Sequence, residues 1–377
     1  MNELTALVSV ALLALAATLA LIGFGDVAPS ALLHLAFAVG IMPLILAAYI
    51  YFVPVLTRSG GAPASVRALP WLALAAGSLS FADMLRPGNI GQEIAIAALA
   101  AVAATGAIAG WTLARARRAI GPAHPCLHWY LAAALCLVLA LAAVLAMPLW
   151  PEQYLALKRM HLHLNMSGFI GITAVGTLQV LMPTVAGRPD PGTGARLRRD
   201  LPYAVAATLV IAGAAAWRGP LAIAGAALWG VPLWRLARAW AAQHRAVIVS
   251  WHGAAPALGV ALAGFALMLF HGAVHGLGIV TTHQAPVAFI TLFLLPLVTG
   301  AVAYLLPVWL RPGPQGPWHA AVRKAAGRWG GARAGIFLCG GLAYALGMPW
   351  GIALSALALL MFVVQVARGL APRHGSN

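Results

Sequence analysis

The chain has 377 residues, of which 62% are hydrophobic and only 8% are charged. A soluble domain of this length has too little interior to bury so much apolar surface, so the composition predicts a polytopic membrane protein. The formal net charge of +16 does not indicate a nucleic-acid partner, because the arginines lie in short clusters between apolar runs, as in the loops of inner-membrane proteins. The three cysteines form no Cys-x-x-Cys pair, which excludes a thiolate zinc site of that kind.

Twelve apolar segments follow one another along the chain, and each predicts a membrane-spanning helix. The first segment lacks the basic residues that precede a cleaved signal, so we expect it to be retained. The protein is therefore expected to be an all-α polytopic membrane protein in contact with membrane lipid. The segments are 4–25, 31–56, 68–85, 92–114, 127–149, 160–185, 201–217, 220–240, 247–272, 283–309, 333–348 and 350–368.

Basic residues lie mostly on one side of these segments. The loops after every second segment, together with the C-terminus, carry most of the 23 lysines and arginines, whereas the other loops carry only Arg86, Lys158, Arg159 and Arg218. Because basic loops stay in the cytoplasm, the pattern predicts a bacterial inner-membrane protein with both termini cytoplasmic.

Three segments share one layout. Segments 31–56, 160–185 and 283–309 each carry a histidine near the start and a proline near the end, namely Pro54, Pro183 and Pro307. This recurrence predicts three pseudo-repeated four-helix units, about 1–120, 121–246 and 247–377, within a single transmembrane domain. Each unit has an even number of spans, so the units are expected to be parallel, around an axis along the membrane normal.

Six histidines fall at the outer ends of predicted spans. Imidazole is the commonest metal ligand in proteins and binds haem iron axially. The six residues are His34, His161, His163, His271, His275 and His283. The alternative is that each is an interfacial polar residue at a helix end.

The positions of these histidines suggest how they group. His34 and His283 begin equivalent spans, which favours them as two axial haem ligands. His271 and His275 are four residues apart and share a helix face. His161 and His163 are separated by about 200° on a helix, so they serve two sites or one of them caps the helix.

We expect the remaining four, His161, His163, His271 and His275, to form a second metal or haem site. Flat, bare helix surface for a large cofactor is predicted at Gly40, Gly168, Gly171 and Ala174.

Twelve spans in three parallel four-helix arcs with histidines near the outer face resemble the catalytic subunit of haem–copper oxidases and nitric oxide reductases. The resemblance implies low-spin haem ligation by His34 and His283, and a copper or iron ligand at His161 or His163. The run His161-Leu-His163-Leu-Asn165-x-x-Gly168 also resembles the haem- and copper-containing membrane proteins of the NnrS group.

The chain departs from the oxidase pattern at two places. The oxidases carry a His-x-His pair on their tenth helix, and its first position here is Thr281. They carry adjacent copper-binding histidines near the seventh helix, whereas segments 201–217 and 220–240 contain none. These departures argue against a complete oxygen-reducing binuclear centre.

The expected function is therefore that of a membrane protein that binds haem b, with copper or iron as a second metal. Its role would be electron transfer or nitric oxide and respiratory metabolism, with a quinol or an electron donor protein as partner. Whether the chain is an oxidoreductase stays open. The alternatives are a copper or haem transporter or assembly factor, and a structural partner whose histidines are merely interfacial.

Overall fold

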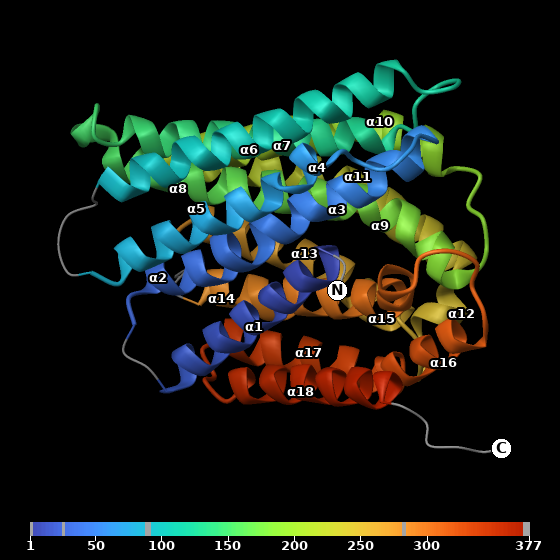
Figure 1. The fold of residues 1–377 in the computed structure, drawn as a ribbon. Coiled ribbons are helices and arrows are strands. Elements are labelled where there is room, and N and C mark those ends of the chain that lie inside the picture. The colour runs from blue at the N-terminus through green and yellow to red at the C-terminus, as the bar shows by residue number, and fades with distance from the viewer. Residues whose placement is uncertain (1–2, 25–26, 87–91, 281–283, 372–377) are drawn as a thin grey trace.

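The computed structural model describes residues 3–24, 27–86, 92–280 and 284–371, and these residues form a bundle of helices without a strand (Figure 1). Within these residues, ten helices are long and apolar enough to cross a membrane. The predicted fold class, an all-α polytopic membrane protein, is confirmed. Its apolar outer surface is the surface that contacts lipid.

Two of the twelve predicted spans are short helices, α5 and α17, of 16 residues each. At 1.5 Å per residue each is about 24 Å long, less than the roughly 30 Å of the hydrocarbon core. The main helices run in three successive groups. They are α1 (Glu3–Phe24), α2–η1–α3 (Pro29–Leu33, His34–Ile41, Met42–Thr57), α5 (Leu69–Met84) and α6 (Gln92–Arg117); then α7 (Cys126–Ala146), α8–η3–α9 (Tyr154–His163, Leu164–Ile170, Gly171–Ala186), α10 (Thr193–Trp217) and α11 (Ala222–Gln243); then α13 (Ala255–Gly276), α14–η5–α15 (Ala285–Phe289, Ile290–Leu294, Leu295–Leu310), α17 (Gly330–Ala345) and α18 (Gly351–Leu370).

The connections contain further short helices, α4 (Ala64–Arg67), α12 (Arg245–Ile248), α16 (Pro317–Ala326), η2 (Pro151–Gln153) and η4 (Gly219–Leu221). Two boundaries differ clearly from the sequence prediction: α13 begins at Ala255 rather than near residue 247, and α10 begins at Thr193 rather than near residue 201. The first two turns of α10 carry three arginines, so an apolar-segment search does not find them although the backbone there is already helical.

Each helix with the histidine-to-proline layout contains one π-helical segment, η1, η3 or η5. In a π-helix the backbone N–H bonds to the carbonyl five residues earlier, which widens the turn. Each of the three segments ends on such a bond: the Met42 N–H donates to the Phe37 carbonyl, that of Gly171 to Met166, and that of Leu295 to Ile290. The recurrent sequence layout is therefore accompanied by a recurrent backbone irregularity, a feature often found at functional sites.

Glycines on neighbouring helices pack against two of these π segments. The Met42 N–H bonds to the carbonyl of Phe37, five residues earlier. In the same spacing the donor for the Ala38 carbonyl would be residue 43, but this residue is proline and has no N–H. That carbonyl faces Gly77 of α5 so closely that a Cβ at Gly77 would lie 2.1 Å from the oxygen. Gly264 of α13 faces the Leu292 carbonyl, one turn before Pro296, in the same way. The absence of a side chain at these glycines lets the helices approach.

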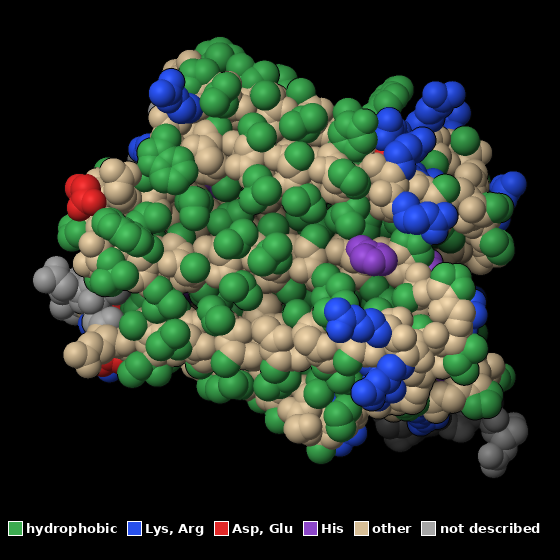
Figure 2. Space-filling model, turned by 90° about the horizontal axis from the view of Figure 1, so that it is seen from above, with side chains coloured by type: hydrophobic (Ala, Val, Ile, Leu, Met, Phe, Trp, Pro, Cys, Tyr) green, Lys and Arg blue, Asp and Glu red, His purple; other side chains and the backbone are tan. Residues whose placement is uncertain are grey.

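The two ends of the bundle differ in charge. Figure 2 shows hydrophobic side chains over the face of the bundle and lysine and arginine gathered towards one end. We call this the arginine-rich end; α3, α6, α9 and α11 finish there, next to Arg58, Arg117, Arg188 and Arg245. The other, the histidine end, is where α2 and α8 begin and α13 finishes.

The prediction that these small residues leave a bare surface for a cofactor is wrong. A Cβ at Gly40, Gly168 or Gly171 would lie 3.2, 2.8 or 2.7 Å from a side-chain atom of Ala14, Cys136 or Phe265 respectively. Ala174 is also buried. Neighbouring helices therefore occupy this surface, because small residues in membrane helices serve close helix packing.

Candidate functional site

A cavity of about 640 Å³ lies at the histidine end, between the α2–η1 and α8–η3 segments and the helices α5, α6 and α7. His34 and His161 both line it, although they come from separate thirds of the chain. Its volume falls within the roughly 300–1,000 Å³ of small-molecule and cofactor sites. The cavity is thus the place where the structure brings two predicted site residues together.

Both imidazoles are held through the same ring nitrogen. His34 Nδ1 lies 2.7 Å from the Ser30 carbonyl oxygen, and His161 Nδ1 lies 2.9 Å from the carbonyl oxygen of Ala140 on α7. A carbonyl can only accept, so each Nδ1 carries the proton and each Nε2 keeps its lone pair. Metal-bound histidines are oriented in this way, by a second-nitrogen hydrogen bond to a carbonyl or carboxylate.

The π segments position these side chains. His34 is the first residue of η1, and His161 lies one turn before η3. Asn165, inside η3, donates its side-chain N–H to the His161 carbonyl at 2.9 Å and supports the helix where its hydrogen-bond register changes. His34 and His161 therefore reach one cavity from two different helices.

The cavity has an apolar interior and a basic mouth. Leu137, Phe169 and other apolar residues line the interior, and exposed Lys158 and Arg159 line the mouth. Arg86 also lines it but is paired with Glu93 at 3.2 Å. Lys158 and Arg159 form no ion pair with the carboxylates of the described residues. One carboxylate, Asp83, also lines the cavity, so its described lining carries more positive than negative charge and suits a largely apolar ligand with negative charge at one edge.

A second group of histidines lies at the same end, from α8 and α13. His163 Nδ1 donates to the Arg159 carbonyl oxygen at 2.8 Å, and His275 Nδ1 donates to that of Val280 at 2.9 Å. His163 and His275 are within charge-interaction range of each other, as are His271 and His275. The α13 helix continues to Gly276, so the latter two lie one turn apart on one helix.

The predicted four-histidine group is not assembled as one cluster. Among the described residues, no three His, Cys, Asp or Glu side chains lie together as metal ligands would. His161 instead lies with His34, and His163 lies with His275, because residues two apart on a helix point in different directions. His283 and Thr281 fall outside the described residues, so the structure does not describe the predicted pairing of His34 with His283.

The pairing of His34 with His161 was missed from the sequence. The sequence prediction paired histidines at equivalent positions of the first and third units. The cavity instead lies between the first and second groups of helices, and α7 forms part of its wall. One signal lay close to it: Lys158 and Arg159 stand three and two residues before His161, on the predicted side of the membrane that has few other cations.

Two histidines at the arginine-rich end have structural partners. His319 Nε2 donates to the Arg311 carbonyl oxygen at 2.9 Å, and its Nδ1 accepts from the Gly316 N–H at 3.1 Å. His252 Nδ1 accepts from the Trp329 N–H at 3.1 Å. These rings hold loops in place and leave less capacity for a ligand.

No family model matches the chain, and no curated protein matches it. The functional assignment therefore depends on the chemistry of the cavity and on its place in the membrane.

Proposed function

We propose that this chain is a haem-binding membrane protein whose iron is held in the cavity at the histidine end by His34 and His161. One observation carries the proposal: two imidazoles from different helices line one cavity, each with Nδ1–H on a carbonyl and Nε2 available. Neutral imidazole in this orientation is the usual axial ligand of haem iron. In this proposal His161, and not His283, is the partner of His34.

The donor set and the charges of the cavity fit haem b. Lys158 and Arg159 at the mouth would pair with the two propionates, and Leu137 and Phe169 would exclude water from the macrocycle. When bound, the haem supplies one-electron redox chemistry at a potential that depends on its axial ligands and on the dryness of its surroundings. The protein contributes ligand orientation through the Ser30 and Ala140 carbonyls.

The physiological role we propose is electron transfer or nitric oxide and respiratory metabolism, in keeping with the resemblance to haem–copper oxidases, nitric oxide reductases and NnrS-type proteins. An electron donor protein or a quinol would be its partner. The gathering of basic residues supports a bacterial inner-membrane location with the arginine-rich end, and both termini, in the cytoplasm. The cavity would then open towards the periplasm.

The second histidine group favours one alternative, a copper or haem transporter or assembly factor. His163, His271 and His275 lie at the same end of the bundle as the cavity, and the buried Nδ1 of His271 has no hydrogen-bond partner among the described residues. Imidazole nitrogens suit copper as well as iron. Copper uptake into vesicles by a protein without a haem spectrum would favour this function over electron transfer.

The test is the reduced-minus-oxidised spectrum of protein purified from haem-supplemented cells, with haem quantified per chain. We expect a low-spin b-type spectrum that His34→Ala and His161→Ala each abolish. His128→Ala is the matched control, because this imidazole is exposed at the arginine-rich end and should leave the spectrum unchanged.

Exogenous imidazole should restore the signal in His161→Gly, which separates loss of a ligand from loss of folding. A folded wild-type protein without a Soret band, or a spectrum that persists in both alanine variants, would refute the proposal.

A further inference from the structure

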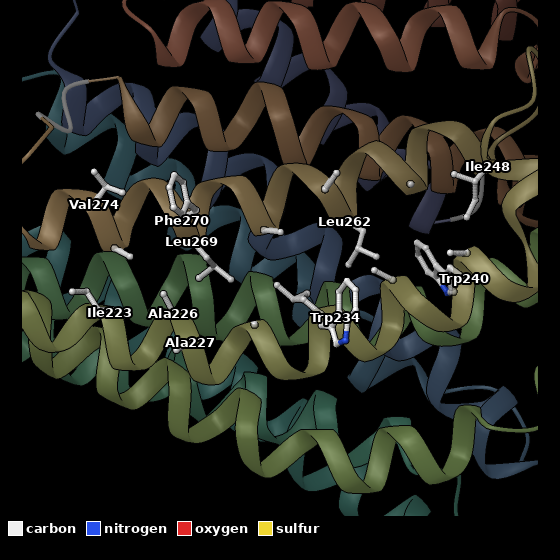
Figure 3. A pocket seen from close by; sticks show the side chains of 18 of the residues that line it. Ile223, Ala226, Ala227, Trp234, Trp240, Ile248, Leu262, Leu269, Phe270 and Val274 are labelled. Atoms are coloured by element: carbon white, nitrogen blue, oxygen red, sulfur yellow. The ribbon is translucent and has the colours of Figure 1, made fainter.

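A second, separate hollow lies between α11 and α13 and reaches α12 at the arginine-rich end (Figure 3). Its volume is about 850 Å³, and it shares no lining residue with the cavity of His34 and His161. It is an open groove, which runs from Ile223 and Val274 at one end to Trp240 and Ile248 at the other. Both helices are long and apolar enough to cross a membrane, and exposed Trp234 and Phe270 border the groove, so it opens onto the bilayer.

Small side chains produce the groove, and large ones border it. Ala226, Ala227 and Gly230 on α11 face α13 across the gap, and a Cβ at Gly230 would meet nothing within 4 Å. Trp234 and Phe270 stand at the border with 69% and 68% of their surface exposed. A hollow of this size in a membrane is filled by hydrocarbon, because an empty one forfeits the contacts of its lining.

Two polar groups lie at the arginine-rich end of the groove. Trp240 is 2% exposed, and its indole Nε1–H has no hydrogen-bond partner among the described residues. Protein atoms enclose this N–H, so Trp240 closes this end of the groove as a wall and offers no donor to a ligand. Arg245, the first residue of α12, is exposed and pairs with none of the described carboxylates.

We propose that this groove binds an anionic phospholipid, with its phosphate at Arg245 and an acyl chain between α11 and α13. Phosphate and guanidinium form strong charge-assisted hydrogen bonds. Basic pockets between membrane helices on the cytoplasmic side are known to take anionic head groups. The lipid would seal the seam between the second and third groups of helices.

Charge selects this occupant over two others. A quinone has a neutral head and would leave the Arg245 charge uncompensated. A second copy of the chain placed against the groove about a two-fold axis along the membrane normal would bring Arg245 towards its own symmetry mate. Of these three occupants, the phospholipid supplies both the hydrocarbon and the negative charge.

The experiment measures lipid retained by the full-length protein after purification in mild detergent, by native mass spectrometry and by analysis of the organic extract. We expect about one anionic phospholipid per chain. Arg245→Gln should weaken binding about 10-fold or more, as expected for loss of a hydrogen bond to a charged group, and Arg245→Lys should bind more tightly than Arg245→Gln. Gly230→Leu should displace the acyl chain, whereas Gly213→Leu, at an equally open position on α10, should not.

Phosphatidylglycerol titrated into the delipidated protein should raise the melting temperature of the wild type more than that of Arg245→Gln, and phosphatidylcholine should raise both equally. The proposal is overturned if the retained molecule is a quinone or a zwitterionic lipid, if the chain retains no lipid, if it dimerises through α11 and α13, or if Arg245→Gln and Gly230→Leu retain as much anionic lipid as the wild type. None of these results depends on haem, so the test is separate from that of the proposed function.

Discussion

Replacement of Gly77 by alanine tests whether the π segment that carries His34 depends on close helix contact. The added Cβ would lie 2.1 Å from the oxygen and 2.5 Å from the carbon of the Ala38 carbonyl, whereas ordinary van der Waals contact begins at 3.4 Å. Both atoms belong to the backbone, so no side chain can rotate out of the way. Either α5 or η1 has to move.

Two opposing effects set the magnitude. Overpacking of this kind costs about 1–3 kcal/mol, and a backbone clash belongs at the upper end of that range. Alanine regains about 0.5–1 kcal/mol because it is a better helix former than glycine. We therefore expect Gly77→Ala to lower the free energy of unfolding by about 2 kcal/mol, since the clash outweighs the helix-propensity gain. Haem affinity should fall as well, because both α5 and η1 line the cavity.

The control is Gly106→Ala on α6, where the new Cβ would meet nothing within 4 Å and only the propensity gain remains. Both variants and the wild type would be unfolded by denaturant titration in mixed micelles, with helical circular dichroism as the signal. The reasoning is refuted if Gly77→Ala is as stable as the wild type, or if Gly106→Ala loses as much stability as Gly77→Ala.

Three further predictions concern buried polar groups. Burial lowers the pKa of His244 below 6.5; neighbouring arginines add to this effect and Asp190 opposes it. As the pH drops below 6.5, only the unfolded chain takes up the proton, so the free energy of unfolding should fall. His244→Leu should flatten this slope in pH-dependent unfolding; an unchanged slope would contradict the assignment. Burial alone would raise the pKa of Asp190, but its hydrogen bond and ion pair with Arg196 at 2.7 Å hold the pKa below 3.8. The contribution of this carboxylate to the free energy of unfolding should therefore be present above pH 3.8 and be lost on further acidification. Asp190→Asn leaves a buried arginine charge and should cost about 3–5 kcal/mol at neutral pH, with a smaller loss arguing that water reaches the pair. Thr173→Val removes the partner of the buried Tyr49 hydroxyl, 2.6 Å away, and should cost about 1–3 kcal/mol, whereas Thr173→Val with Tyr49→Phe should recover much of that loss in a double-mutant cycle.

The membrane class and the approximate positions of the helices follow from the sequence because insertion into a bilayer depends mainly on the residues of each segment. For example, segment 92–114 lies within α6, and segment 127–149 overlaps most of α7. Segments with a charged first turn, such as α10, are predicted too short. The π segments could not be predicted, since the register of backbone hydrogen bonds changes there without a unique sequence signal.

The position of the histidines along their helices was predictable, but their partners were not. His161 and His163 could be assigned to different directions from their spacing, yet which neighbouring helix each one meets depends on how every helix is rotated and packed. In these helices nearly all faces are apolar, so the sequence does not distinguish a face that meets lipid from one that meets protein.

By itself, therefore, the sequence determined that this is a multi-pass membrane protein with its basic residues gathered on one side and histidines at several helix ends. These are properties of single segments. Only the tertiary structure decided that His34 lies in one cavity with His161, that the glycines predicted to be bare are covered by other helices, and that α11 and α13 leave a groove between them. Those properties belong to pairs of helices, and they depend on contacts between residues far apart in the chain.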